Sequence, residues 1–405
     1  MTQVPIKIPG YANPFYITVG FQVDEIKSEI RDLSIPTTLL DYPFLKAIEV
    51  CPPQGLTPIY LILFNEDYQP IGFYYFQVKY FKASESVRRG ETENDFFCRL
   101  HKKLTGLVKN LVEFNTLVCG NLLISGPVGY FLKNEYRTSE SLIYQYLIEE
   151  VQGWLRSNNT DTNVTLVKDF YDTNKPLENS TYHSFTIQPS MMMDIQNHWD
   201  SFDAYLEDLL SKYRVRAKRA IKAASRLKRT EINLEEIIEC NHELYELYKQ
   251  TSTNAEFNLF DLHPEYFIEL KKQLGDQFHL YTYRLNGQLI AFFTTIEDDS
   301  ECEAHFLGID ESKNKEYQIY LNILFEIIRQ SIKLKKCRVR FSRTALEIKS
   351  SVGAIPITLT CYIKHRKVIN NTFVPFIIDF LGQNLPWIPR HPFKEVNQIA
   401  GSVII

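Results

Sequence analysis

The stretch FHLYTYRLNGQLIAFFTTIE, at residues 278–297, decides the fold that the sequence predicts. Two segments rich in β-branched and aromatic residues flank Asn286-Gly287, a dipeptide that accepts the positive φ angles of a type I′ turn and so marks a β-hairpin. Further predicted elements are a strand, a helix, a strand, a short helix and a strand, at 301–307, 317–334, 337–341, 345–352 and 357–364. A hairpin followed by a β-α-β unit predicts an α/β fold with a mixed sheet.

A coarser version of the same order appears earlier in the chain. Its predicted strands and helices lie at 57–64, 71–80, 93–114 (helix), 116–124, 139–155 (helix), 165–170 and 184–188. Two more helices, at 201–229 and 234–251, precede the hairpin, and the polar residues between 189 and 200 mark a junction. We therefore predict two tandem units with mixed sheets, at 1–190 and 191–405, the first serving as a scaffold or as a platform for the acceptor.

Composition limits the class of protein. The chain has 405 residues, 44% of them hydrophobic, and a formal net charge of -4, so its overall balance does not indicate nucleic-acid binding. Its seven cysteines are scattered without a C-x-x-C pair, which is typical of free thiols in a reducing compartment. No signal peptide, membrane-spanning run or metal-ligand cluster stands out. These features predict a soluble, cytoplasmic protein.

Residues 212–229 hold nine basic residues and no acidic one. On a helix, like charges four residues apart cost about 0.2–0.5 kcal/mol per pair, so the pattern favours a bound anion such as a phosphate, a carboxylate or a tRNA backbone. Arg214, Arg216 and Lys218 are the candidate anion-binding residues. The alternative is a solvated basic helix that acidic neighbours balance.

Arginines alternate with apolar residues in CRVRFS, at 337–342. Because a central strand of an α/β sheet is usually apolar on both faces, Arg338 and Arg340 indicate that one face meets a polar cleft. The alternative is that both arginines pair with acids on a covering helix.

Three more charged residues follow this strand. Arg343, Glu347 and Lys349 come at its carboxyl end, where ligands gather in open α/β sheets. Arg343 is suited to holding a carboxylate or phosphate through two hydrogen bonds. The alternative is a salt bridge between Arg343 and Glu347 within the short helix.

The order of elements resembles the GNAT acyltransferase fold, in which the fourth and fifth strands splay apart. Two such units in tandem resemble the Fem aminoacyl-ligases, which attach amino acids to peptidoglycan precursors. The stretches that carry the resemblance are WDSFDAY (199–205), KYRVR (212–216), SRTALEIKSSVGA (342–354) and CGNLLISGPVG (119–129). The resemblance implies acyl-CoA or aminoacyl-tRNA as the donor, and an amine of a small molecule or a peptidoglycan precursor as the acceptor.

The resemblance also implies catalytic residues, and the sequence departs from the family pattern in one phosphate-binding loop. His305 lies on the strand where many GNAT enzymes carry a general base, and Tyr362 on the last strand could protonate a leaving group; a structural role for His305 is the alternative. The loop at 308–315 has one glycine and two acids, Asp310 and Glu311, which disfavour the pyrophosphate of CoA. The Gly126–Gly129 turn is a substitute phosphate site or simply a strand terminator.

We therefore expect an N-acyltransferase or aminoacyltransferase that acts on an amine, in metabolism related to peptidoglycan or the cell envelope. The competing hypothesis is a non-catalytic binding protein for an anionic ligand or partner. The apolar, proline-broken tail at 373–389 either packs against the units or makes peripheral contact with a membrane.

Overall fold

The computed structural model describes residues 3–82, 113–173, 175–178, 180–254, 260–375, 378 and 387–394. The chain divides into two compact units. The first comprises 1–189, 232–279 and 358–384, and the second comprises 190–231, 280–357 and 385–405. The boundary differs from a single division at residue 190, because the chain returns to the first unit twice after leaving it.

The first unit is built on a nine-stranded sheet in the order β1-β2-β3-β4-β5-β7-β16-β8, with β6 paired to β4. Its strands are β1 (Val4–Ile6), β2 (Phe15–Gly20), β3 (Leu56–Phe64), β4 (Pro70–Lys82), β5 (Glu113–Cys119), β6 (Tyr130–Leu132), β7 (Val164–Tyr171), β8 (His183–Thr186) and β16 (Leu359–His365). β5 and β7 run parallel, whereas β3–β4, β4–β5 and β7–β16 are antiparallel, so the sheet is mixed.

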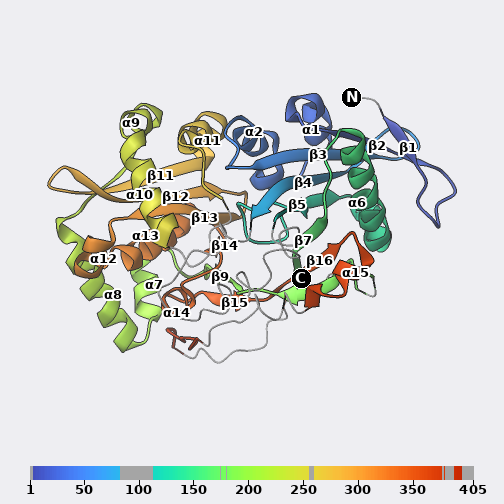
Figure 1. Cartoon of the computed structure of the whole chain (residues 1–405). Coiled ribbons are helices and arrows are strands. Elements are labelled where there is room, and N and C mark those ends of the chain that lie inside the picture. The colour runs from blue at the N-terminus through green and yellow to red at the C-terminus, as the bar shows by residue number, and fades with distance from the viewer. Residues whose placement is uncertain are drawn as a thin grey trace, which may run out of the picture. The chain divides into compact units, whose positions relative to one another are not determined.

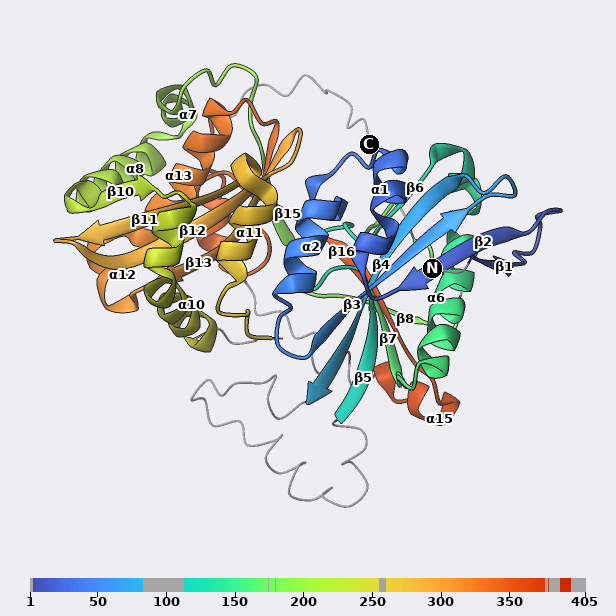
Figure 2. The same ribbon diagram turned by 90° about the horizontal axis from the view of Figure 1, so that it is seen from above.

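Helices cover both faces of this sheet. Alternate residues of β3 point to opposite faces of the sheet, as the two-residue period of a strand requires. Ile59, Leu61 and Leu63 pack with α6 (Glu140–Ser157) on one face. Tyr60 and Ile62 pack instead with α1 (Lys27–Leu33) and α2 (Tyr42–Val50). Figure 2 shows α6 on one side of the strands and α1 and α2 on the other. The other α-helices described in this unit are α9 (Leu234–Glu239), α10 (Asn241–Asn254), α11 (Tyr266–Leu274) and α15 (Val368–Asn371).

The second unit is built on a seven-stranded sheet in the order β10-β11-β12-β13-β14-β9-β15. Its strands are β9 (Ser190–Asp194), β10 (Lys228–Glu231), β11 (Phe278–Leu285), β12 (Gln288–Glu297), β13 (Glu301–Ile309), β14 (Arg338–Arg340) and β15 (Ile355–Ile357). Its helices are α7 (Phe202–Asp208), α8 (Ser211–Ala223), α12 (Glu311–Tyr317), α13 (Ile319–Lys333) and α14 (Leu346–Ser350). β13 and β14 run parallel, and the helices α7, α8 and α13 pack on one face of the sheet.

The two sheets repeat one topology, which confirms the prediction of tandem α/β units (Figure 1). In each sheet a run of antiparallel strands is followed by one helix crossover and a parallel strand, β7 in the first and β14 in the second. The strand next to β7 or β14 in each sheet comes from the segment that the sequence order would give to the other sheet. β9, which follows the strands of the first sheet in sequence, pairs with β14, and β16, which follows those of the second, pairs with β7. The strand predicted at 357–364 therefore belongs mainly to the first sheet, which corrects its assignment to the second unit.

The hairpin that led the sequence prediction is confirmed. Asn286 and Gly287 have φ angles of 51° and 87°, the signs that a type I′ turn requires. Arg284 Nη1 donates a hydrogen bond of 2.9 Å to Gly287 O, which fastens the turn to the strand.

Other predicted elements differ from the structure. The single helix predicted at 201–229 is two helices and a strand, α7, α8 and β10, because Leu209 and Leu210 are extended, with ψ angles of 139° and 146°. Residues 93–112 of the helix predicted at 93–114 lie outside the described residues, and 113–114 begin β5.

Part of the C-terminal tail is described. Trp387 and Phe393 pack against the apolar core of the second unit, and the Phe393 ring lies 5.4 Å from that of Trp199. Residues 376, 377 and 379–386 of the predicted apolar tail lie outside the described residues. In the part of the chain that the structure describes, no helix has the length and apolar content needed to cross a bilayer.

Candidate active site

Two parallel strands of the second unit separate near their carboxyl ends. The β13–β14 ladder pairs Glu301 with Arg338 and Glu303 with Arg340, and it ends there. Beyond this point β13 continues along β12 as far as Ile309, whereas the chain after β14 stays with β9, since Met191 N donates to Ser342 O at 2.9 Å. The strands thus splay apart, as the GNAT resemblance implies.

A β-bulge lies on β13 just after the splay begins. The β12–β13 register shifts between Phe293 and Thr295, so that Thr294 faces both His305 and Phe306. The Thr294 hydroxyl donates to Phe306 O at 3.0 Å and accepts from Phe306 N at 2.9 Å. Bulges redirect side chains and are frequent beside active sites, so this one marks the splay as a candidate site.

The loop after β14 has an unusual backbone. Ser342, Thr344 and Ala345 all have positive φ angles, 60°, 66° and 48°, which are costly for residues with a Cβ atom. Lys349 secures the loop, because its Nζ donates to Arg343 O at 2.6 Å and to Ser342 O at 3.4 Å. Such strain persists only where surrounding contacts enforce it, and it concentrates at functional sites.

A cluster of buried charges fills the sheet face at the start of the splay. Arg340 is its centre: Nε lies 3.0 Å from Glu303 Oε2 and 3.2 Å from Glu301 Oε2, and Nη2 lies 3.4 Å from Asp298 Oδ2. Glu303 is 2% exposed and Arg340 is 7% exposed. The intervening residues Cys302 and Val339 enter the apolar core on the opposite face, so the alternation along the strands separates charge from core.

This environment shifts the acid–base properties of two groups. Burial raises the pKa of the Glu303 carboxyl to about 8, with help from the negative charges of Glu301 and Asp298 and against the effect of Arg340. Burial also lowers the pKa of the Lys349 ammonium to about 7, while Glu303 acts in the opposite direction. Both groups can therefore exchange protons near neutral pH, as acid–base catalysis requires.

The two predicted catalytic residues lie in different units. His305 is on the bulge of β13; it keeps part of its surface accessible, yet burial lowers the pKa of its imidazole to about 3. Such an imidazole is neutral and too weak a base to retain a proton taken from an ammonium. Tyr362 is on β16, in the apolar core of the first unit, where burial raises the pKa of its hydroxyl to about 12.

The other residues predicted around β14 fall into two groups. Arg340 and Lys349 belong to the buried site. Arg338 pairs with Asp194 at 2.6 Å and Glu301 at 3.4 Å, so these acidic partners of the two arginines lie on neighbouring strands or the adjoining turn. Glu347 is exposed and pairs with Arg390 at 3.1 Å, which lowers the pKa of its carboxyl. The half-buried Arg343 follows β14 at the splay.

The basic helix α8 presents its charges to solvent. Ala217 and Ala220 are buried on its inner face, and Arg216 and Lys218 are exposed. Arg214 is half-buried and its Nη1 donates to Glu207 O at 3.3 Å. Within the described part of the chain, neither Arg216 nor Lys218 forms an ion pair with an acid, so the acidic neighbours of the alternative interpretation are not seen for these two residues.

Both candidate phosphate loops are occupied by aspartates. Asp310 is the N-cap of α12, and its Oδ1 accepts from Ser312 N at 3.0 Å and from Ser312 Oγ at 2.6 Å. In the first unit, Asp169 Oδ2 accepts the Gly126 N–H at 3.0 Å and also pairs with Lys168. One backbone amide in each loop, that of Ser312 and that of Gly126, therefore donates to a carboxylate of the protein and is not available to a phosphate.

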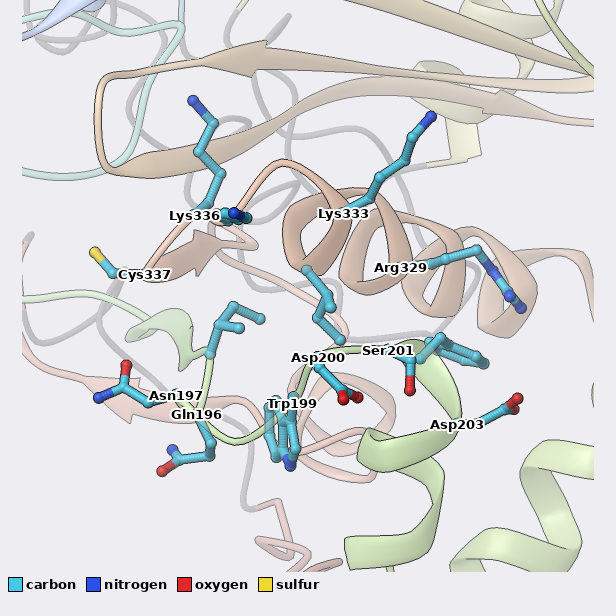
Figure 3. Close-up of a pocket in the computed structure, with 14 residues that line it drawn as sticks. Gln196, Asn197, Trp199, Asp200, Ser201, Asp203, Arg329, Lys333, Lys336 and Cys337 are labelled. Atoms are coloured by element: carbon cyan, nitrogen blue, oxygen red, sulfur yellow. The ribbon is translucent and has the colours of Figure 1, made fainter.

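A pocket of about 770 Å³ lies at the amino end of β14, lined by residues that follow β9 and by the end of α13. Figure 3 shows Arg329, Lys333 and Lys336 on one side and Asp200 and Asp203 on the other. Arg329 stacks on the Phe202 ring at 4.0 Å, and Lys336 pairs with Glu297 at 2.8 Å. None of the predicted site residues lines this pocket, whose mixed charge suits a polar ligand.

Sequence reasoning missed Glu303 and Asp298. A signal was present, because Glu301 and Glu303 alternate with the same two-residue period as Arg338 and Arg340. Matching charge periods on neighbouring strands indicate ion pairs across a shared face, although they cannot show that the pairs are buried.

Comparisons with known proteins agree with this geometry. Residues 211–349 match a family model described as an acetyltransferase (GNAT) domain, and no curated protein matches the chain. Among solved structures, FemX is similar with a TM-score of 0.53 and 10% identity over 89% of this chain and 99% of that chain. A tandem GNAT protein from the clavulanic acid biosynthesis pathway has a TM-score of 0.50 and 7% identity over 87% of this chain and 98% of that chain. Residues 211–349 therefore resemble a GNAT domain, and the chain as a whole has a tandem GNAT-like fold.

Proposed function

We propose that this protein transfers an acyl or aminoacyl group to an amine at the splay of β13 and β14. The observation that carries the proposal is Glu303, a buried carboxyl whose pKa is raised to about 8 within the matched GNAT region, one residue before the strands part. In this reaction the amine nitrogen attacks the acyl carbonyl carbon, a C–N bond forms, and the bond to the donor's oxygen or sulfur breaks. Glu303 in its ionised form accepts the proton that the amine loses, directly or through one water, and the departing oxygen or sulfur of the donor takes up a proton in turn.

The surrounding residues have supporting roles in this proposal. Arg340 holds the Glu303 carboxylate in place, and Lys349 fixes the loop 342–345 beside it. Arg343 is proposed to hold a carboxylate or phosphate of the donor or acceptor, because it follows the strand at the carboxyl end. His305, uncharged at neutral pH, is proposed to position the acceptor through hydrogen bonding.

An aminoacyl-tRNA donor is favoured over acyl-CoA. Asp310 occupies the helix start where a CoA pyrophosphate would sit, and Glu311 adds a second negative charge there. The exposed cations of α8 offer a surface for a polyanionic backbone. On the basis of the Fem resemblance, we propose a cytoplasmic reaction with an amine of a peptidoglycan precursor or small molecule as acceptor. The alternative, a non-catalytic protein that binds an anionic ligand, is supported by the same helix.

A donor comparison tests this function. The protein is incubated with a panel of amines and either a pool of tRNA charged with labelled amino acids or labelled acetyl-CoA. We expect label to reach an amine from the tRNA pool and not from acetyl-CoA, and calorimetry should show weak or no CoA binding. Micromolar CoA affinity that disappears in Gly308→Val would reverse the donor assignment. Transfer from neither donor, with tRNA binding retained, would favour the non-catalytic alternative.

The basic helix gives a second expected result. Changing Lys218 and Lys222 to Gln together should weaken tRNA binding and reduce the slope of log affinity against log salt by about 2, since each lysine releases about one counterion. Thermal stability should stay level or rise slightly, because like-charge repulsion is relieved. The matched control removes two exposed lysines of the first unit, Lys7 and Lys367. Equal losses in both double variants would mean that net charge, and not α8, is responsible.

A further inference from the structure

Three potential metal ligands from distant parts of the chain meet in the first unit. A ligand atom of each of Cys51, His263 and Glu265 lies within 4.8 Å of the other two. Cys51 is the C-cap of α2, and His263 and Glu265 precede α11. A thiol, an imidazole and a carboxylate are the three donor types that zinc takes from proteins.

The backbone around these residues is held in place from several sides. Gln54 N donates to Asp261 O at 2.9 Å, which joins the segment after Cys51 to the segment before His263. Lys249 Nζ lies 2.7 Å from Asp261 Oδ2, and the Tyr248 hydroxyl accepts from Leu262 N at 3.1 Å. Ligands on fixed element ends lose little entropy on binding a metal, so this arrangement is favourable for a site.

The surroundings of the thiol favour a cation. Cys51 is 3% exposed, and the carboxylates of Glu265 and Glu269 are its charged neighbours. Nearby negative charge makes a lone thiolate unfavourable, but it stabilises a divalent ion that replaces the thiol proton. Lys272 is the opposing charge in this region, and it lies 3.8 Å from Glu269.

We propose that Cys51, His263 and Glu265 bind one zinc ion, with a water molecule as the fourth ligand. Bonds of about 2.0–2.3 Å would require the ligand atoms to draw closer by a small side-chain adjustment. His263 Nδ1 accepts a hydrogen bond from Glu265 N at 3.2 Å. Metal binding breaks this long hydrogen bond, because Nδ1 either coordinates the ion or carries the ring proton when Nε2 coordinates it. The Glu265 amide then lies near solvent. The thiolate disfavours Mg²⁺ and Ca²⁺, which prefer oxygen ligands alone. The ion would tie α2 to the start of α11.

The site does not rest on the proposed transferase activity and is tested without it. The full chain is stripped of metal with a chelator and titrated with Zn²⁺ by calorimetry, and with Co²⁺ by absorption spectroscopy. We expect one Zn²⁺ per chain, a thiolate-to-cobalt charge-transfer band, and a higher melting temperature with Zn²⁺, because the ion binds only the folded state.

Matched variants make the result specific. Cys51→Ser and His263→Gln should each weaken Zn²⁺ binding by about a hundredfold or more, since even outer-shell changes cost ten- to a hundredfold. The controls Cys337→Ser and His242→Gln remove an exposed thiol and an exposed imidazole outside the site and should change nothing. The metal-free melting temperature of each variant reports folding separately. No saturable one-to-one binding, or binding that survives both site changes, would overturn the proposal.

Discussion

Glu303→Gln should lower turnover by about a hundredfold to ten-thousandfold, the range for loss of a positioned general base. The amide keeps the size of the carboxyl and can still accept a hydrogen bond, but it cannot take a proton from the attacking amine. The Michaelis constant should change little, since the role lies in proton transfer and not in holding the ground state. Steady-state kinetics with the donor identified in the transfer assay measures both quantities.

Glu301→Gln is the matched control. Glu301 lies two residues earlier on β13, also contacts Arg340, but is more exposed, with 22% of its side chain accessible. Its replacement should leave turnover within a few-fold of the original. Equal losses in both variants would mean that the cluster acts only through its net charge.

The pH dependence of the free energy of unfolding gives a second test of the raised pKa of Glu303. Its pKa is about 8 in the fold and 4.5 as the ordinary value, so the folded state keeps a proton that the unfolded chain releases between these values. The contribution of this group to stability is therefore full below pH 4.5 and is lost as pH rises to 8. Urea unfolding should show that Glu303→Gln gains stability relative to the original chain across this window. Parallel profiles would contradict the shift.

The main lines of the fold were predictable because local patterns encode them. Asn286-Gly287 specifies its turn through backbone conformation, and two-residue alternation specifies the strands around it. The exchange of β9 and β16 was not predictable, since a short apolar strand such as Met191–Met193 would satisfy either sheet equally well. Which sheet it joins depends on the path of the whole chain, and no local residue pattern records that path.

The candidate site was predictable in kind but not in detail. Alternation at Arg338 and Arg340 predicted a face that meets a polar cleft, whereas the structure pairs both arginines with acids, and the burial of Glu303 among them depends on neighbours that only tertiary structure supplies. His305 attracted attention because histidine titrates near neutral pH in water, and the structure removes that property by burial. The Cys51 cluster was invisible for a related reason: its ligands have no fixed spacing, because α2 and α11 meet only in the fold.

Arg340→Met should destabilise the fold by about 3–5 kcal/mol, because it leaves the Asp298 and Glu301 carboxylates beside a buried site without their counter-ion. Asp298, Glu301 and Glu303 all lie within 3.4 Å of this one guanidinium. Methionine fills much of the same volume, so the loss reports charge more than packing. Urea unfolding at pH 7 measures the change.

Arg338→Met is the matched control, because it removes the same charge from a more exposed position. This residue is on the same strand and face, but its side chain is 38% exposed, so its pairs with Asp194 and Glu301 should contribute about 1 kcal/mol or less. The deficit of Arg340→Met should also shrink as pH falls towards 4.5. Without the arginine, the carboxyls bind protons more tightly in the folded chain than in the unfolded one, so acid restores stability that is lost as pH rises. A deficit that stays constant with pH would instead assign the loss to packing, and Arg340 would then be a structural residue and not the electrostatic partner that holds Glu303 for proton transfer.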